Sequence, residues 1–285
     1  MMRRRRAAAV SALAGVVAAV GVLVVSSGSS DTAPDERAAT QPAKPEAKRK
    51  PAGGIQVSRA GWMRHPGPVP FLMYHVIGEP KPGAPFPDLY VSVEDFERQI
   101  QYLDDHGYQA VTQRQVMDGW EKNSLLPPKP VVLTFDDGYL GQYTDALPLL
   151  RRLDWPGVLN LKAEGSDLST GQVRKMVAAG WEIGSHTVSH ADLTLVDATT
   201  LAQELSRPLD ILRRRFGVRV ESFCYPAGRY NEAVVAAVRR AGYRSATTTD
   251  PGLASSEEPF TLKRIRIGSD TGLDGLISEL RAGAA

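Results

Sequence analysis

Two carboxylates and two histidines are the residues whose types and spacing could do chemistry together in this sequence. Asp136 and Asp137 follow the apolar run at residues 131–135 and are followed in turn by Gly138. Asp-Gly pairs are common in solvated turns. Two adjacent carboxylates at the end of a strand repel each other, however, and a divalent metal would relieve that repulsion. The pair is therefore compatible with a turn or with a metal site.

His186 and His190 supply the second half of this candidate site. They follow a short strand-like run at residues 181–183, and histidines four positions apart share one face if the chain is helical there. With Asp137 they make a three-ligand set that leaves one position open for water, as catalytic zinc sites do. Zinc, cobalt or nickel would suit these ligands. The alternative is a chance pair of surface histidines.

The elements that must position these residues alternate between helix-like and strand-like segments. Amphipathic stretches with helical spacing end at Gly107, Gly180 and Gly242, and each glycine precedes an aromatic residue and a strand-like run. Glycine suits the position after a helix because it accepts a positive φ. Residues 131–135 and 222–225 are predicted to be buried strands. This alternation predicts a parallel α/β architecture, either a barrel or an open sheet, with chemistry at the carboxyl ends of the strands.

Charge and cysteine content exclude several classes of protein. Residues 1–65 contain 11 Lys/Arg and 4 Asp/Glu, a net charge of +7, so the rest of the chain carries −5. A nucleic-acid-binding protein would concentrate positive charge on its folded part, so no nucleic-acid partner is expected. Cys224 is the only cysteine, which excludes an internal disulfide. We expect a small packed side chain there rather than a nucleophile, because no histidine adjoins it in sequence.

The amino-terminal region predicts a protein that acts outside the cytoplasm. Four consecutive arginines precede an uncharged stretch at residues 7–25. A membrane-spanning helix needs about 20 apolar residues, whereas the apolar region of a cleaved signal peptide has about 7–15. The nineteen residues of this stretch therefore favour a retained membrane anchor within residues 1–25 over a cleaved signal peptide. The arginines should stay inside, so the chain beyond is expected to be exported, either membrane-anchored or secreted. Residues 26–65 predict a disordered linker, and residues 66–285 a folded domain.

The two motifs together resemble those of the polysaccharide deacetylases, the carbohydrate esterase family 4 or NodB-homology domain. The sequence TFDDG at residues 134–138 is followed about fifty residues later by the histidine pair, and the resemblance spans about residues 69–267. It implies a distorted (β/α) barrel that hydrolyses N-acetyl groups of amino sugars. It also implies that Asp136 is the general base and that Asp137, His186 and His190 are the metal ligands. The backbone amide of Ala227 would bind the oxyanion.

Two positions depart from the family pattern. Many members have an arginine that steadies the catalytic aspartate where this chain has Cys224, and many end with a histidine acid that is missing from residues 262–267. We expect that the roles have moved. His75 ends the opening strand-like run, as in the subgroup that deacetylates poly-N-acetylglucosamine, and would supply the acid if the first strand of a closed barrel lies beside the last. A structural histidine is the alternative. The need for charge beside the aspartate suggests Arg264 or Arg266.

The function that follows is metal-dependent release of acetate from an extracellular or cell-wall polysaccharide that contains N-acetylglucosamine. The alternatives are a catalytically inactive carbohydrate-binding domain of the same fold and an O-acetyl esterase of the xylan type. The expected partners are the acetylated polysaccharide and, through the amino-terminal segment, a membrane. Residues 80–89 form either a groove loop, with Phe86 or Tyr90 available to stack on sugar, or a proline-stiffened connection.

Overall fold

Seven parallel strands close into a barrel within residues 59–283, the part of the chain that the computed structural model describes. The first strand, β1, pairs with β5 on one side and with β10 on the other, which closes the ring. In chain order the barrel strands are β1 (Phe71–Tyr74), β5 (Pro130–Asp136), β6 (Val158–Leu161), β7 (Glu182–Ser185), β8 (Ser222–Cys224), β9 (Ser245–Pro251) and β10 (Leu262–Arg266). The register between β9 and β10 shifts between Leu262 and Arg264, so the ring is irregular there. The expected distorted (β/α) barrel is confirmed.

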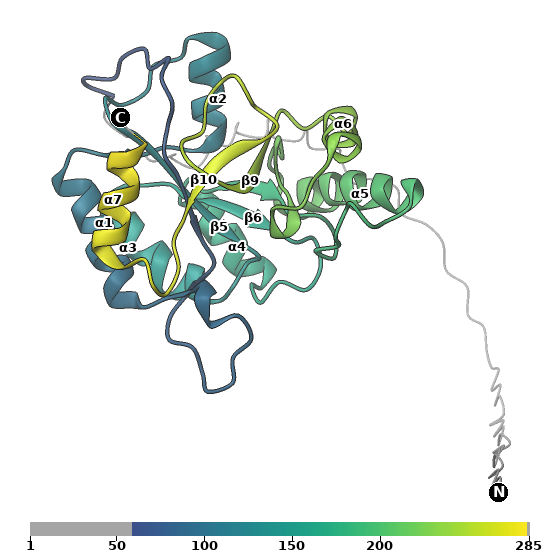
Figure 1. Ribbon diagram of the computed structural model, residues 1–285, viewed down its shortest axis with the longest axis horizontal. Helices are drawn as coiled ribbons and strands as arrows, with labels where there is room; N and C mark the ends of the chain where they lie inside the picture. The colour runs from purple at the N-terminus through teal and green to yellow at the C-terminus, as the bar shows by residue number, and fades with distance from the viewer. Residues whose placement is uncertain (1–58, 284–285) are drawn as a thin grey trace, which may run out of the picture. The chain divides into compact units, whose positions relative to one another are not determined.

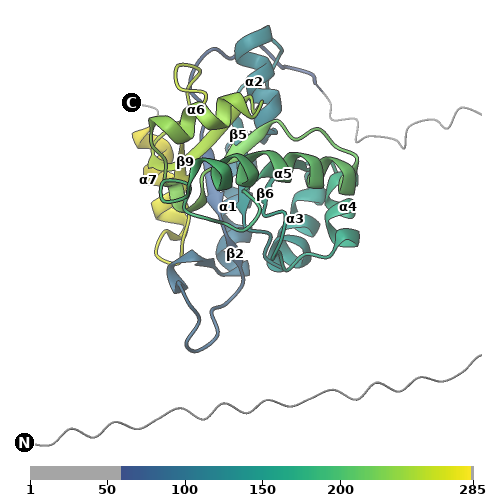
Figure 2. The ribbon, with the colours of Figure 1, turned by 90° about the vertical axis from the view of Figure 1, so that its right-hand side faces the viewer.

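Helices surround the ring of strands (Figures 1 and 2). They are α1 (Val93–Asp105), α2 (Gln113–Lys122), α3 (Leu147–Arg152), α4 (Thr170–Ala178), α5 (Ala198–Phe216), α6 (Glu232–Arg240) and α7 (Gly272–Ala282). The smaller elements are β2 (Val76–Ile77), β3 (Tyr90–Val91), β4 (Gln109–Ala110), η1 (Pro87–Leu89), η2 (Gln142–Ala146) and η3 (Pro226–Gly228). As the sequence predicted, Gly107, Gly180 and Gly242 follow the ends of α1, α4 and α6, and all three have a positive φ.

The alternation of side chains along β5 explains where polar chemistry can occur in this barrel. Successive side chains of a strand point to opposite faces. Leu133 and Phe135 pack into the larger apolar core, whereas Val132 belongs to a second apolar cluster. On the face of Val132, the later positions along the strand are Thr134 and Asp136, both buried and polar. The carboxyl end of the barrel interior is therefore polar, above an apolar layer.

Most predictions about the amino-terminal region fall outside the described residues. This holds for the anchor or signal peptide at residues 1–25 and for most of the linker at residues 26–65. Met63 exchanges two backbone hydrogen bonds with Leu126, with N···O distances of 2.7 and 2.9 Å, so the last residues of the predicted linker contact the folded domain. Between residues 59 and 283, no helix is both long enough and apolar enough to cross a bilayer.

Candidate active site

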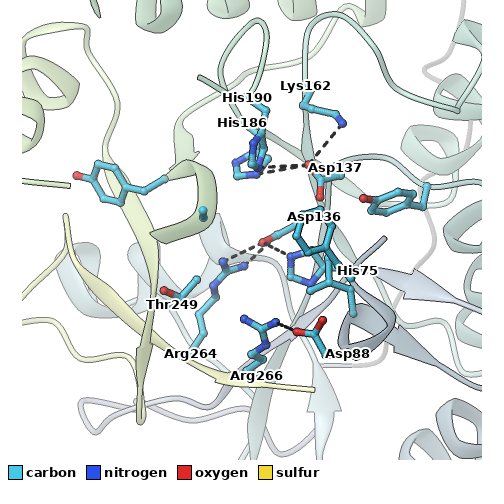
Figure 3. Close-up of a pocket in the computed structure, with 15 residues that line it drawn as sticks. His75, Asp88, Asp136, Asp137, Lys162, His186, His190, Thr249, Arg264 and Arg266 are labelled. Carbon is cyan, nitrogen blue, oxygen red and sulfur yellow. Dashed lines mark hydrogen bonds and ion pairs between the residues drawn. The ribbon is translucent and has the colours of Figure 1, made fainter. Parts of the chain in front are cut away.

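A cavity of about 400 Å³ at the carboxyl ends of the strands is lined by all the residues predicted to be catalytic, to bind the metal or to bind the oxyanion (Figure 3). It lies at the end of the barrel where parallel α/β folds place their active sites. The predicted site residues that line it are His75, Asp136, Asp137, His186, His190, Ala227 and Arg264. The other lining residues are Phe86, Asp88, Leu89, Tyr139, Lys162, Tyr225, Thr249 and Arg266.

Asp136 ends β5 inside the barrel and is bound by the guanidinium of Arg264, which comes from β10. The two guanidinium nitrogens Nη1 and Nη2 donate to the two carboxylate oxygens, each at 2.9 Å. The side-chain amide of Asn160 donates a further hydrogen bond to Oδ1 at 2.8 Å. Burial by itself would raise the pKa of Asp136, but the charge and hydrogen bonds of Arg264, together with the nearby imidazoles of His75 and His186, outweigh burial and hold that pKa well below its usual range. The carboxylate is therefore ionised at neutral pH.

The structure distinguishes the two arginines that the sequence left open. Arg264 is buried, and beyond Asp136 it donates through Nε to the carbonyl of Thr248 at 2.7 Å and contacts Sγ of Cys224 at 3.3 Å. Arg266 instead donates to the carboxylate of Asp88 at 2.6 Å, near the rim of the cavity. Cys224 is fully buried and its pKa is raised by burial, as expected for a packed thiol rather than a nucleophile.

Asp137, His186 and His190 present three ligand atoms to one point. Oδ1 of Asp137 lies 3.7 Å from Nε2 of His186 and 3.6 Å from Nε2 of His190. Nδ1 of His186 is 2.8 Å from the carbonyl of Cys224, so a proton on Nδ1 donates to that carbonyl and leaves Nε2 free for a metal. Two imidazoles, one carboxylate and an adjoining cavity fit a divalent metal with an open coordination position.

The two histidines converge through an irregular turn rather than along a helix. Thr187 and His190 have left-handed φ angles of 65° and 64°, which are uncommon for residues other than glycine. The hydroxyl oxygen of Thr187 accepts a hydrogen bond from the N–H of His190 at 2.8 Å, which stabilises the turn. The spacing alone suggested that the two histidines share one face of a helix, but residues 186–190 are not helical. The imidazole centroids nevertheless lie 4.8 Å apart.

Lys162 and Asn160 are site residues that the sequence reasoning missed. Nζ of Lys162 lies 3.6 Å from Oδ1 of Asp137, so an ammonium group stands beside the candidate metal ligands. Asn160 lies in β6 and Lys162 directly follows that strand. A polar residue that interrupts the apolar run at residues 158–161, followed by a lysine at the strand end, was the available signal. Asp136 was identified in the same way, as a polar residue at the carboxyl end of a predicted strand.

His75 follows β1 and faces Asp136 across the seam between β1 and β5. Its Nε2 lies 3.8 Å from Oδ2 of Asp136. The side-chain amide of Gln142 donates to the backbone carbonyls of both residues, at 2.8 Å to His75 and 2.7 Å to Asp136, which holds the two in register. Burial lowers the pKa of His75, although the nearby carboxylate of Asp136 opposes this shift. The imidazole is therefore neutral near neutral pH.

Ala227 occupies a turn whose backbone is closely constrained. It has φ 50° and ψ 21°, a left-handed conformation within η3. Gly228 also has a positive φ, of 68°, and a Cβ at this position would collide with the side chain of Thr249. Because a side chain on Gly228 would have no space, the path of the chain past the cavity is fixed at this point.

The comparisons with known proteins agree with this geometry. A sequence model of the polysaccharide deacetylase family matches residues 124–246. The "Putative polysaccharide deacetylase YxkH" of Bacillus subtilis (strain 168) is 30% identical over 248 residues, which cover 82% of this chain and 87% of that protein. The poly-beta-1,6-N-acetyl-D-glucosamine N-deacetylase of Escherichia coli (strain K12) is 25% identical over 64% of this chain and only 34% of that protein.

Solved structures of deacetylases share the fold. The Streptococcus pyogenes deacetylase PplD, in complex with acetate, superposes with a TM-score of 0.70 at 29% identity, covering 75% of this chain and 99% of that one. The polysaccharide deacetylase BC0361 from Bacillus cereus gives a TM-score of 0.67 at 29% identity, covering 75% of this chain and 69% of its own. Fold, cavity and sequence similarity lead to one assignment. The chain belongs to the polysaccharide deacetylase family and is a hydrolase of amide bonds.

Proposed function

We propose that this deacetylase removes N-acetyl groups from a polysaccharide that contains N-acetylglucosamine, and that it requires a divalent metal. The observation that carries the proposal is the convergence of Asp137, His186 and His190 beside the ionised carboxylate of Asp136. The Escherichia coli relative, named for poly-beta-1,6-N-acetyl-D-glucosamine, supports the choice of sugar. The bidentate contact from Arg264 supports an active enzyme over an inactive binding domain, because it supplies the charge missing at Cys224.

Asp137, His186 and His190 would hold the metal, which when bound would polarise the acetamido carbonyl and lower the pKa of water to about 7. Zinc is the ion we propose, and cobalt and nickel suit the same ligands. Asp136 takes the proton from the attacking water. Arg264 keeps both oxygens of that carboxylate in a fixed orientation through its paired hydrogen bonds.

The amine leaves only if it is protonated, and His75 is the proposed donor. Its Nε2 lies 3.8 Å from the carboxylate of Asp136, so it can receive the proton taken from water and pass it to the nitrogen as the C–N bond breaks. The imidazole begins and ends this cycle neutral, in agreement with its lowered pKa. The products are acetate and a free amino sugar.

The backbone N–H of Ala227 is the proposed donor to the oxyanion that develops as water attacks. The residue lines the cavity in a turn fixed by Gly228 and Thr249. A preorganised backbone donor stabilises developing charge without reorganising during the reaction. The fixed turn supports this role for Ala227.

The site of action is proposed to lie outside the cytoplasm, with the amino-terminal segment as a membrane anchor or an export signal. Its support is the arginine cluster and the uncharged stretch at residues 7–25. Cells that express the whole chain are expected to hold the enzyme in the membrane fraction or to release it. Recovery in the cytoplasmic fraction would contradict the proposal.

The enzymatic proposal is tested by acetate release together with metal analysis on one protein sample. N-acetylglucosamine oligomers are expected to release acetate faster than O-acetylated xylan oligomers. A chelator should stop the reaction, and added zinc, cobalt or nickel should restore it, because three ligands converge in the cavity. Full activity after complete metal removal would refute the metal requirement, and a preference for O-acetyl groups would indicate an esterase.

His75→Ala is expected to lower kcat by about 100- to 10,000-fold, the usual range for loss of general acid–base catalysis, with bound metal unchanged. Acetate release and metal content are measured together. The matched control is His106→Ala, which changes an exposed histidine that does not line the cavity. Loss of metal in His75→Ala would make His75 a ligand, and an unchanged kcat would make it a structural residue.

A further inference from the structure

An exposed aromatic side chain stands at the edge of the catalytic cavity. Phe86 is 69% exposed and belongs to the loop of residues 78–89, which extends away from the barrel next to β2 (Figure 2). Among the large hydrophobic side chains exposed within residues 59–283, it is the one that lines this cavity. Exposed apolar surface beside a binding cavity marks a place where a ligand can pack.

The backbone holds this ring in an unusual conformation. Phe86 has φ 53° and ψ 59°, a left-handed geometry that is strained for a bulky residue. Proline flanks it on both sides, and its carbonyl accepts a hydrogen bond from the N–H of Leu89 at 3.0 Å. Such strain persists where the surroundings fix it, and it is concentrated at functional sites.

Asp88 attaches the loop to the last barrel strand. Its carboxylate accepts a hydrogen bond from Arg266 at 2.6 Å, and its carbonyl accepts one from the N–H of Ser269 at 3.3 Å. A Cβ on Gly268 would collide with the same carbonyl, so the loop and the segment after β10 are in close contact. The strand that brings Arg264 to Asp136 therefore also fixes the base of the loop.

We propose that Phe86 forms a carbohydrate subsite that stacks against the pyranose ring next to the sugar being deacetylated. This inference rests on the proposed action on an N-acetylglucosamine polysaccharide. A pyranose presents an apolar C–H face to an aromatic ring while its hydroxyl groups remain in water. In Figure 3, Asp88 and Arg266 lie on the opposite side of Asp136 from His186 and His190. A glycan with its acetamido group at the metal ligands would extend over the loop.

The test compares ligands of different length on the metal-loaded enzyme. Glucosamine and its tetramer, the deacetylated products, bind without turnover and are measured by calorimetry, and KM is measured for the N-acetylated tetramer. Phe86→Ala is expected to weaken tetramer binding and to raise this KM, each about tenfold. Phe86→Tyr keeps the ring and should restore both values. Leu195→Ala, which removes an 80% exposed side chain outside the cavity, is the matched control.

The outcomes separate this inference from the proposed function. Equal tetramer affinity in the parent and in Phe86→Ala overturns the subsite, as does a parent that binds tetramer no better than monomer. A parent that binds the tetramer but releases no acetate refutes the proposed function, while the comparison at Phe86 still decides the subsite.

The attachment of the loop has its own test. Asp88→Arg places like charges together beside Arg266 and is expected to weaken tetramer binding severalfold. Adding Arg266→Asp reverses the pair and should restore binding. Tetramer affinity that is unchanged in Asp88→Arg would show that the ion pair does not position the loop.

Discussion

Replacing His186 with alanine is expected to remove the bound metal and to abolish acetate release. His186 supplies one of three ligand atoms, and its imidazole is fixed by the contact with the carbonyl of Cys224. Loss of a group that merely orients a ligand typically costs about 10- to 100-fold in metal affinity or activity, so loss of a ligand should cost more. Metal content by elemental analysis and acetate release on the same preparation check the prediction.

His106→Ala provides the control for this experiment, because it also exchanges a histidine for alanine but at an exposed position outside the cavity. It should keep the metal content and rate of the parent. Circular dichroism would show whether His186→Ala retains the barrel. A folded His186→Ala protein that still binds one metal ion per chain would remove His186 from the ligand set.

Replacing Arg264 with glutamine is expected to destabilise the folded protein by about 3–5 kcal/mol near pH 7. The reason is that the buried carboxylate of Asp136 would lose its counter-charge and two of its hydrogen bonds. Acetate release should fall as well, because the carboxylate is no longer held in one orientation. Urea denaturation and acetate release measure the two effects.

The stability defect of Arg264→Gln is expected to shrink in acid. Arg264 holds the pKa of Asp136 below its value in the unfolded chain. Its stabilisation is therefore complete above the unfolded value of about 3.9 and is lost as the pH falls through the folded one. In the variant the unpaired buried carboxyl has a higher pKa and takes up a proton sooner. The stability difference from the parent should be smaller at about pH 5 than at pH 7.

A second substitution identifies the cause of the stability loss in Arg264→Gln. Adding Asp136→Asn to Arg264→Gln removes the unpaired charge, so stability should recover in part while activity stays lost. A double variant no more stable than Arg264→Gln alone would show that lost packing of the arginine, rather than an unpaired carboxylate, destabilises the fold.

The sequence predicted the elements of the fold well because each depends on local patterns. The apolar runs at residues 131–135 and 222–225 are β5 and β8, and the helix-ending glycines are where the spacing placed them. Sequence periodicity could not distinguish a barrel from an open sheet, because the difference is whether the first strand pairs with the last. The structure shows that contact directly, with Leu72 of β1 opposite Ile265 of β10.

The choice between Arg264 and Arg266 could not be made from sequence. The two residues are two positions apart on one strand, so they share a face and carry the same charge. What separates them is height along the barrel, about 6.6 Å for two residues of a parallel strand. Arg264 is level with the carboxylate of Asp136, whereas Arg266 reaches the rim and Asp88. The height of each arginine relative to Asp136 depends on the register in which β5, β1 and β10 pair, and no local sequence pattern encodes that register.

The turn that joins His186 to His190 was unpredictable for a different reason. It uses left-handed backbone at Thr187 and His190, and sequence rules assign that conformation mainly to glycine and asparagine. The strain is tolerated because surrounding contacts hold the turn, including the carboxylate of Glu204, which accepts hydrogen bonds from the backbone N–H groups of Val188 and Ser189. Such support comes from α5 and is visible only in the assembled fold.

The pairing of β1 with β10, which closes the barrel, also determines when the site can form during synthesis. β1 and β10 are neighbours in space but lie near opposite ends of the folded domain, and Asp136 is made long before Arg264. A nascent chain that ends before residue 262 therefore lacks both the closing strand and the cation that compensates the buried carboxylate. The catalytic centre is completed only after β10 has been synthesised, so polypeptides that end before this strand carry no assembled hydrolase.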